Sequence, residues 1–417
     1  MPVRKRVATM IILFLTVSVL LCGCGEQTPT ETVSQRETTT PHEQAQYHPA
    51  NPVPSKLRED ECGQSLTWQI TGSTLTVKGS GEMYDFTTAP WSSMRSSVYT
   101  IVVESGVESI GDNAFSGMDS AYTVRIADTV QRIGRNAFSF CASLGDVRIP
   151  NGVQSVEEGC FEGCQKLWRV SIPDSVTVIE NRAFNLCDKL STMSLPKRLV
   201  RIGDEAFAFC ERLYRCDIPA SMTHLGVASF VRCTRLSKFT VADGNPNFSA
   251  DQDGVLFSRS GAMLLAYPSG KAGSSYTVPD SVQVIGERAF AYCDNLKSVD
   301  IPDTVETIGA GAFYNCNNLE QVRLPQMLKA LPAQMFSNSD RLETLVLPEK
   351  LEQIGTEAFM GCDGLREIII PASVQIIERH AFENCSNLSV TVLGKEIATD
   401  GWDVFWVDPN ATVQWNP

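Results

Sequence analysis

Apolar and polar positions recur along most of this chain with the 23-residue period that separates Phe115 from Phe138. Each unit contains a Phe, and apolar residues follow it by nine and eleven positions, as Val147 and Ile149 follow Phe138. The residue between them is often polar, as Arg148 is, and this alternation predicts a short β-strand with one buried face. The Phe positions are Phe115, Phe138, Phe161, Phe184, Phe207 and Phe230, and then Phe290, Phe313, Phe336, Phe359 and Phe382.

A second apolar pair follows the predicted strand in each unit. A Pro often ends the strand, because Pro cannot donate to a sheet ladder, and a pair such as Val176 and Ile179 comes next. A unit of this size cannot bury its own apolar face, whereas stacked units join their faces into one continuous core. The sequence therefore predicts a solenoid of short parallel strands, with compact or helical-turn returns.

The unit of residues 301–319, IPDTVETIGAGAFYNCNNL, resembles the BspA-like branch of the leucine-rich repeat family. The spacing of Leu319, Val322 and Leu324 is that of a leucine-rich strand, although the usual Asn is missing and a Cys precedes the Leu. The match extends over roughly residues 106–393 and implies a leucine-rich repeat solenoid. The resemblance also implies a bacterial surface protein that binds other proteins, often those of a host.

The N-terminus has the features of a secretion signal. A basic cluster, residues 4–6, precedes the apolar run of residues 7–21, which is short for a membrane span. The following Cys22-Gly23-Cys24 is similar to a bacterial lipobox, so we expect a lipoprotein signal peptide at 1–23 and lipidation of Cys24. An ordinary secretory signal is the alternative. A lipid on Cys24 would hold the protein at the outer face of a membrane without spanning it.

Residues 24–57 are rich in Thr, Gln, Glu and Pro, a composition typical of a disordered tether. In residues 58–105, apolar and polar residues alternate on either side of Gly72, which predicts a β-hairpin. We expect this hairpin to be a cap, because a solenoid needs atypical units at its ends. Residues 394–417 contain four large aromatic residues and are either the second cap, which we expect, or an exposed aromatic patch.

Between Phe230 and Phe290 the period is interrupted by an insertion near residues 242–275. Two short strands, 255–257 and 263–267, predict a second β-hairpin there. Asp and Asn residues precede these strands, but their spacing does not fit a calcium-binding loop, so we interpret them as turn residues.

The net charge and the sequence motifs limit the classes of function that this protein can have. The chain has 35 basic and 48 acidic residues, a net charge of −13, which argues against general nucleic-acid binding. We expect no enzyme activity, metal or cofactor, because the sequence contains none of the common catalytic, zinc-binding or phosphate-binding motifs. A Cys follows most Phe positions by three residues, and we predict a ladder of buried, reduced thiols. These cysteines are Cys141, Cys164, Cys187, Cys210, Cys233, Cys293, Cys316, Cys362 and Cys385.

The outward positions of the predicted strands combine basic and aromatic residues in the first half of the repeat. They are Tyr122, Arg125, Arg148, Trp168, Arg169, Tyr214, Arg215 and Lys238. Arg and aromatic residues are enriched at interface hot spots, so we predict that a monomer binds a host or extracellular-matrix protein through this surface. A solvated sheet face is the simpler alternative. A glycan-binding or glycan-hydrolysing surface lipoprotein is the second candidate function.

Overall fold

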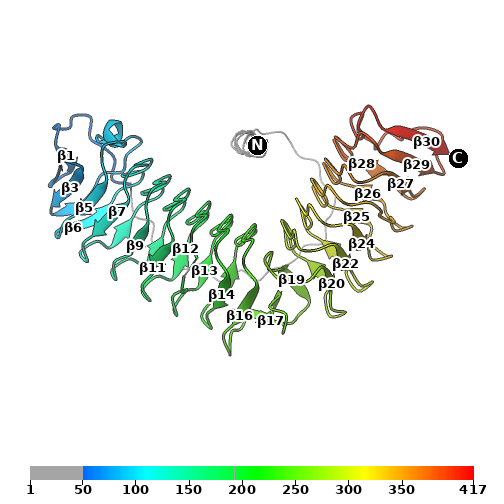
Figure 1. Ribbon diagram of the computed structural model, residues 1–417, viewed down its shortest axis with the longest axis horizontal. Helices are drawn as coiled ribbons and strands as arrows, with labels where there is room; N and C mark the ends of the chain where they lie inside the picture. Colours follow the sequence, from blue (N-terminus) through cyan, green and yellow to red (C-terminus); the bar gives the residue numbers. More distant parts are fainter. Residues whose placement is uncertain (1–49, 192) are drawn as a thin grey trace, which may run out of the picture. The chain divides into compact units, whose positions relative to one another are not determined.

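The computed structural model describes residues 50–191 and 193–417. The predicted signal peptide, the lipidation site Cys24 and most of the predicted tether therefore lie outside the described residues. Residues 50–417 form one compact unit, in which successive coils of the chain stack side by side in sequence order (Figure 1). Within the described residues, no helix is long and apolar enough to cross a membrane.

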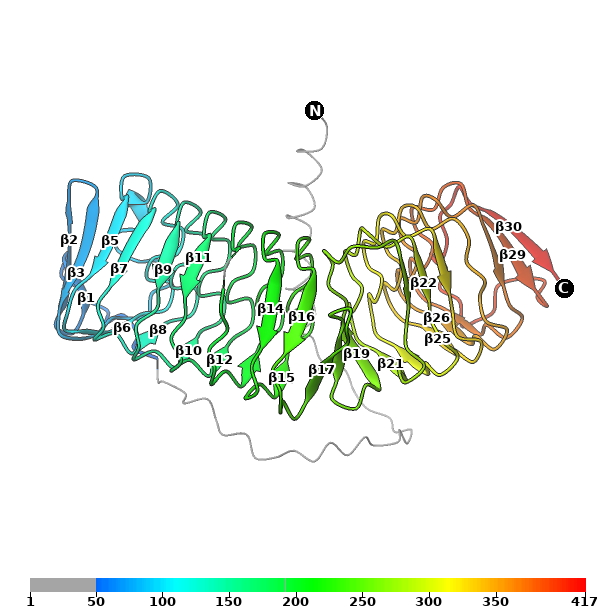
Figure 2. The same ribbon diagram turned by 60° about the horizontal axis from the view of Figure 1, so that its bottom comes forward.

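Most coils contribute one strand to each of two rows. The first row contains the strands predicted nine to eleven residues after each Phe, and it runs along the whole stack (Figure 2). Its strands are β3 (Thr74–Gly79), β5 (Thr100–Val103), β7 (Thr123–Ile126), β9 (Asp146–Arg148), β11 (Arg169–Ser171), β14 (Arg215–Ile218), β16 (Lys238–Val241), β20 (Ser275–Thr277), β22 (Ser298–Asp300), β24 (Gln321–Arg323), β27 (Glu367–Ile370), β29 (Ser389–Leu393) and β30 (Thr412–Asn416).

The second row is formed by the apolar pair that follows each first-row strand. Most of its members are only two residues long, which is why the sequence shows them as a pair and not as a full alternation. They are β4 (Gly81–Glu82), β6 (Val107–Ile110), β8 (Arg132–Ile133), β10 (Ser155–Val156), β12 (Val178–Ile179), β13 (Arg201–Ile202), β15 (His224–Leu225), β19 (Met263–Ala266), β21 (Val284–Ile285), β23 (Thr307–Ile308), β25 (Ala330–Leu331), β26 (Gln353–Ile354) and β28 (Ile376–Ile377).

The strands pair in parallel, and their register keeps the period of the sequence. In the first row, Val170 of β11 lies opposite Val147 of β9, and in the second row Ile202 lies opposite Ile179. Side chains at alternate positions of β9 and β11 point into the core, and their neighbours are exposed. The predicted solenoid of short parallel strands is confirmed.

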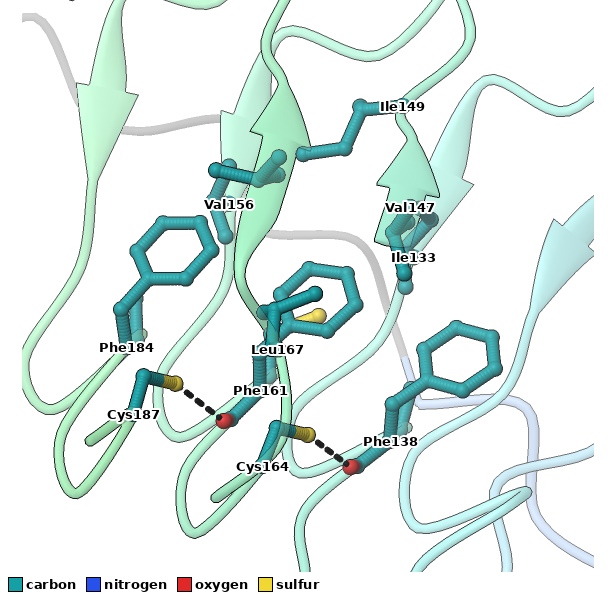
Figure 3. Packing of buried hydrophobic residues seen from close by; sticks show 14 of the residues in the cluster. Ile133, Phe138, Val147, Ile149, Val156, Phe161, Cys164, Leu167, Phe184 and Cys187 are labelled. Carbon is teal, nitrogen blue, oxygen red and sulfur yellow. Dashed lines mark hydrogen bonds between the residues drawn. The ribbon is translucent and has the colours of Figure 1, made fainter. Parts of the chain in front are cut away.

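The column of Phe side chains forms the centre of the core. Neighbouring rings from Phe115 to Phe230 stack with centroids 5.2–5.5 Å apart. Figure 3 shows Phe138, Phe161 and Phe184 in this arrangement, with side chains of both strand rows packed beside them. Offset-stacked aromatic pairs contribute about 0.5–1.5 kcal/mol beyond their buried area. Stacking of the rings therefore stabilises the contact between neighbouring coils in addition to the burial of apolar area.

The returns between strands are turns, and the described residues contain a single short helical segment, the 3-10 helix η1 (Ser92–Met94). In a typical coil, Asn136 and Phe140 flank Phe138 at positions −2 and +2, and both have left-handed backbone angles, with φ of 52° and 56°. The N–H groups of Asn136, Phe138 and Phe140 donate to carbonyls of the next coil at 2.9, 2.9 and 2.6 Å. Each return is thus a third inter-coil ladder, which explains why its length does not drift.

The first coil is covered by the predicted hairpin. Strands β2 (Leu66–Thr71) and β3 pair antiparallel around Gly72, and β1 (Glu61–Gly63) lies at the outer edge. Trp91 stacks on Phe115 at 5.5 Å and donates its indole N–H to the Ala114 carbonyl at 2.7 Å, so it takes the place of a Phe before the first repeat. Asn51, within the predicted tether, bonds to Asp85 of this cap at 2.8 Å.

The insertion contains a complete further coil. Tyr267 precedes Phe290 by one period of the repeat, its N–H bonds to the Ala289 carbonyl at 2.8 Å, and its ring lies 5.3 Å from that of Phe290. The enlargement is confined to the chain between Phe230 and Tyr267. There β17 (Phe248–Ala250), β18 (Leu256–Ser258) and β19 form an antiparallel meander. The predicted hairpin is confirmed, with β17 as an additional strand.

The C-terminal residues continue and then cover the stack. Strand β30 extends the first row by one more coil, pairing in parallel with β29. Trp402 and Trp406 are buried, and the Trp406 ring meets Phe382 edge-to-face at 5.9 Å, at the end of the Phe column. Phe405, by contrast, is exposed. Three of the four aromatic residues of this segment therefore contribute to the end of the core, since Trp415 also packs against it.

Candidate binding surface

The outward side of the first-row strands, named here the strand face, carries all eight residues that the sequence predicts as a binding surface. Every one of these side chains is exposed. They belong to β7, β9, β11, β14 and β16 or precede one of these strands directly, and Figure 2 shows these strands in one row, with one coil between β11 and β14. The structure therefore brings the predicted residues onto one face of the first half of the stack.

The three aromatic residues occupy one structural position. Tyr122, Trp168 and Tyr214 each lie seven residues after a Phe, directly before β7, β11 and β14, and they are 56%, 49% and 53% exposed. Tyr99 holds the same position before β5, and its ring stacks on that of Tyr122 at 6.1 Å. These four residues are named the aromatic row. Sequence reasoning missed Tyr99, although it lies one period before Tyr122, because the cap lacks the Phe that marks each repeat.

Small residues separate the rings of the aromatic row. Gly145 lies between Tyr122 and Trp168, and Ser191 lies between Trp168 and Tyr214. The backbone joins these positions coil by coil, because Gly145 N donates to Tyr122 O at 3.3 Å and Trp168 N donates to Gly145 O at 2.9 Å. The indole of Trp168 extends over Gly145, with Nε1 3.7 Å from the place that a Cβ on Gly145 would occupy. From Tyr122 onward, the row is therefore an alternation of rings and gaps.

The basic residues of the strand face fall into two groups. Arg148 pairs with Asp128 at 2.8 Å, and Arg215 pairs with Asp217 at 2.6 Å. Their charges are partly neutralised, although exposed ion pairs of this kind contribute only about 0–1 kcal/mol. Within the described residues, the other basic residues have no ion-pair partner; they are Arg125, Arg169 and Lys238. The free positive charge is thus smaller than the sequence alone suggests.

The same face has a different character in the second half of the stack. Val346 and Ile369 are exposed at outward positions, and Arg323 is held by Asp300 and Asp303 at 3.1 and 3.4 Å. The positions equivalent to the aromatic row hold the polar residues Lys297, Glu320, Glu343, Arg366 and Ser389. The combination of rings with unpaired basic residues is therefore restricted to the first half.

The thiol ladder is buried away from this surface. The 12 cysteines of the described region are buried and free, and no disulfide links them. Cys164 donates its thiol proton to the Phe138 carbonyl of the preceding coil, and Cys187 donates to Phe161, both with Sγ 3.2 Å from the oxygen (Figure 3). Burial raises the pKa of the Cys141 and Cys233 thiols to about 12. The predicted ladder of buried thiols is confirmed, and burial keeps these thiols protonated, which makes them poor nucleophiles.

The two histidines of the described region lie in different environments. His224 is exposed on β15, whereas His380 lies against Glu383, with Nδ1 3.0 Å from the carboxylate, and against the ring of Phe405. The imidazole of His380 is therefore partly covered by the C-terminal segment, whereas that of His224 is exposed. Among residues 50–191 and 193–417, no three His, Cys, Asp or Glu side chains are grouped to hold a metal ion.

Comparison with known proteins defines the class of this protein. The family model described as "BspA type Leucine rich repeat region (6 copies)" matches residues 93–173, 132–251 and 269–389. The chain belongs to the BspA-type leucine-rich repeat family, a repeat scaffold, as the resemblance of its repeat implied.

Solved structures agree with this assignment. A leucine-rich cell surface protein from Faecalibacterium prausnitzii is 28% identical, with a TM-score of 0.61 over 82% of this chain and 97% of that chain. A leucine-rich repeat protein from Eubacterium ventriosum is 23% identical, with a TM-score of 0.61 over 85% of this chain and 95% of that chain. The pneumococcal vaccine antigen PcpA has the same TM-score at 19% identity, over 86% and 98% of the two chains. A search of curated proteins found no match.

Proposed function

We propose that this protein is a binding module on the outside of a bacterial cell, and that it holds a protein partner on the first half of its strand face. The observation that carries the proposal is the aromatic row beside three basic residues without ion-pair partners. Exposed aromatic rings on a rigid sheet supply contact area at a small cost in conformational entropy. Interface hot spots are enriched in Trp, Tyr and Arg, the residue types gathered here.

The family supports both the type of role and the location. BspA-type repeats form scaffolds for protein interaction, and the F. prausnitzii relative is described as a cell surface protein. We further propose that a lipid on Cys24 anchors the chain, on the basis of Cys22-Gly23-Cys24 after the apolar run of residues 7–21. The polar residues that follow would then separate the solenoid from the membrane.

The experiment measures binding of the full chain, purified in detergent, to a panel of purified host extracellular-matrix proteins. Arg125→Glu combined with Arg169→Glu reverses two unpaired charges on the strand face. We expect this variant to weaken binding about tenfold or more, because complementary charge is replaced by repulsion. The affinity of the natural chain should also fall as salt is added, since exposed charges are screened.

The matched control is Arg366→Glu with Lys350→Glu, which changes the net charge equally in the second half. Its affinity should stay within about twofold of the natural chain, because rim charges distant from the contact contribute little. If the control pair loses binding and the Arg125 and Arg169 pair retains it, the surface has been assigned to the wrong half. If no panel protein binds in a manner that depends on Arg125 and Arg169, the proposed function is wrong for this class of partner.

A further inference from the structure

From Tyr122 onward, the aromatic row has a repeat of two coils. Tyr122, Trp168 and Tyr214 are separated by two periods of the sequence at each step. Neighbouring parallel strands lie about 4.8 Å apart, so equivalent rings recur roughly every 9.6 Å along the stack. Gly145 and Ser191 leave a gap on the coil between each pair of rings. A ligand that fits this row must place similar groups at the same two-coil spacing.

A polyproline II helix has that repeat. It has three residues per turn and rises about 3.1 Å per residue, so every third side chain returns to the same face after roughly 9.3 Å. Over the two steps from Tyr122 to Tyr214 the mismatch is only about 0.6 Å. Two turns of a polyproline II peptide therefore match the row from Tyr122 to Tyr214. A β-strand, which rises about 3.3 Å per residue with a period of two, repeats roughly every 6.6 Å and does not.

The chemistry of the row fits the same ligand. Aromatic-lined grooves are the common receptor for Pro-rich segments, because Pro rings pack well against aromatic faces. A polyproline II backbone makes no internal hydrogen bonds, so its carbonyls are free to accept from the receptor. The Trp168 indole nitrogen lies beside Gly145 and, within the described residues, donates to no acceptor. It is therefore available to bond a ligand carbonyl.

The charges beside the row select among Pro-rich segments. Arg169 follows Trp168 directly, Arg125 is three residues beyond Tyr122, and Lys238 lies one coil beyond Arg215. None of Arg169, Arg125 and Lys238 has an ion-pair partner in the described part of the chain. A ligand with Glu or Asp on one of its three faces would meet this positive charge while its Pro residues meet the rings.

We propose that the aromatic row is a site for an acidic, Pro-rich protein segment in the polyproline II conformation. This inference rests on the proposed function, because it names the kind of segment that a protein partner would present. The site spans the coils from Tyr122 to Tyr214, and Trp168 is its centre. The polar residues at equivalent positions of the second half exclude a second copy of the site there.

The test uses synthetic peptides and the full chain in detergent. A peptide of four Pro-Pro-Glu repeats is the probe, and four Gly-Gly-Glu repeats with the same charge are the control. We expect the Pro peptide to bind at least about tenfold more tightly, because the Gly peptide must be ordered on binding and lacks the Pro rings. Four Pro-Pro-Lys repeats should bind most weakly, since their charge has the wrong sign.

Three variants localise the site. Trp168→Ala should weaken binding about tenfold or more, and Trp168→Phe should weaken it by a smaller factor, because Phe keeps a ring and loses the N–H donor. Gly145→Val should also weaken binding, since its branched side chain fills the gap beside the Trp168 indole. Glu343→Ala changes the equivalent row position in the second half and should have no effect. Circular dichroism of each variant checks that the fold is retained.

The outcomes separate this inference from the proposed function. If the Pro-Pro-Glu peptide binds no better than the Gly-Gly-Glu peptide, or binds Trp168→Ala unchanged, the inference is overturned. Loss of matrix-protein binding in the Arg125 and Arg169 variant would still support the proposed function. If chondroitin sulfate binds in place of the peptide and Trp168→Ala abolishes that binding, the ligand is an anionic glycan. If sedimentation shows a dimer that Trp168→Ala dissociates, the row is occupied by a second copy; either result overturns the inference.

Discussion

Replacement of Cys187 tests what the thiol ladder contributes to stability. The side chain is fully buried, and Sγ lies 3.2 Å from the Phe161 carbonyl of the preceding coil. That carbonyl also accepts the N–H of Cys164 at 3.2 Å, so loss of the thiol does not leave it without a partner. One natural coil has Ser339 at the Cys position, and its hydroxyl donates to the Phe313 carbonyl at 2.9 Å. The site therefore accepts a hydroxyl with its hydrogen bond satisfied.

From these contacts we predict how much each of three variants lowers the free energy of unfolding. Cys187→Ser retains the donor and should reduce the free energy of unfolding by less than about 1 kcal/mol, because a satisfied buried hydroxyl costs little. Cys187→Ala removes one weak hydrogen bond and leaves a small void, at about 1–2 kcal/mol. Phe184→Ala interrupts the Phe column with a large cavity and should cost about 3–5 kcal/mol.

The measurement is urea unfolding of each variant by circular dichroism, with hydrogen exchange of the amides around Cys187. Both are needed because a repeat protein can open in parts, and the exchange data report the affected coils separately. If Cys187→Ser is clearly less stable than Cys187→Ala, the position is selected for an apolar atom alone. The thiol-to-carbonyl bond would then contribute nothing to stability, and a hydrogen-bonding role for the ladder would be refuted.

Three further predictions concern reactivity, backbone strain and anchoring. Burial raises the pKa of the Cys141 thiol from 9.0 to about 12. The contribution of this thiol to the free energy of unfolding should therefore be fully present below pH 9 and fall as the pH rises from about 9 to 12, where the unfolded chain loses the thiol proton first. Urea titrations at several pH values above about 8 measure the free energy of unfolding, and a flat profile from pH 9 to 12 would contradict this prediction. Glu205 is exposed and has a φ of 55°, so Glu205→Gly should stabilise the protein by up to about 1 kcal/mol. The control is Glu306→Gly, at an exposed residue without a left-handed angle. It should destabilise the protein by about 0.5–1 kcal/mol in the same urea assay. Cys24→Ala should release the protein from membranes or block its processing, and retention after a high-salt wash would rule out the lipid anchor.

Much of the fold follows from the repeat, because a strict period leaves few ways to stack the units. The Phe and Cys columns and both hairpins were predictable from residue spacing. The coil of Tyr267 was not, since a Tyr replaces the Phe and its distance from Phe230 is not a multiple of the period. The turns were also missed: Phe140 and Glu205 adopt left-handed angles that their residue types disfavour, and their N–H groups bond to carbonyls of the next coil.

The candidate site was predictable in its position and less so in its charge. Alternation within each strand is enough to place Arg148 and Arg169 outward, whereas Trp168 precedes β11 and is not placed by alternation. The partner of Arg148 is Asp128, which does not lie one full period earlier in the chain, so no periodic pattern indicates that pair. Tyr99 could have been found by extending the period of the repeat into the cap. The lean of the Trp168 indole over Gly145 depends on rotamers, which spacing does not determine.

The most direct test of binding on the strand face is side-chain footprinting of the full chain with hydroxyl radicals, with and without a matrix protein that it binds. Aromatic side chains react readily, so Tyr122, Trp168 and Tyr214 report the first half of the strand face, while Phe405 and Met327 are exposed controls elsewhere. We predict that binding protects the first three and leaves the two controls unchanged. Protection of Phe405 or Met327, with Tyr122, Trp168 and Tyr214 still fully reactive, would contradict the assignment of the binding surface.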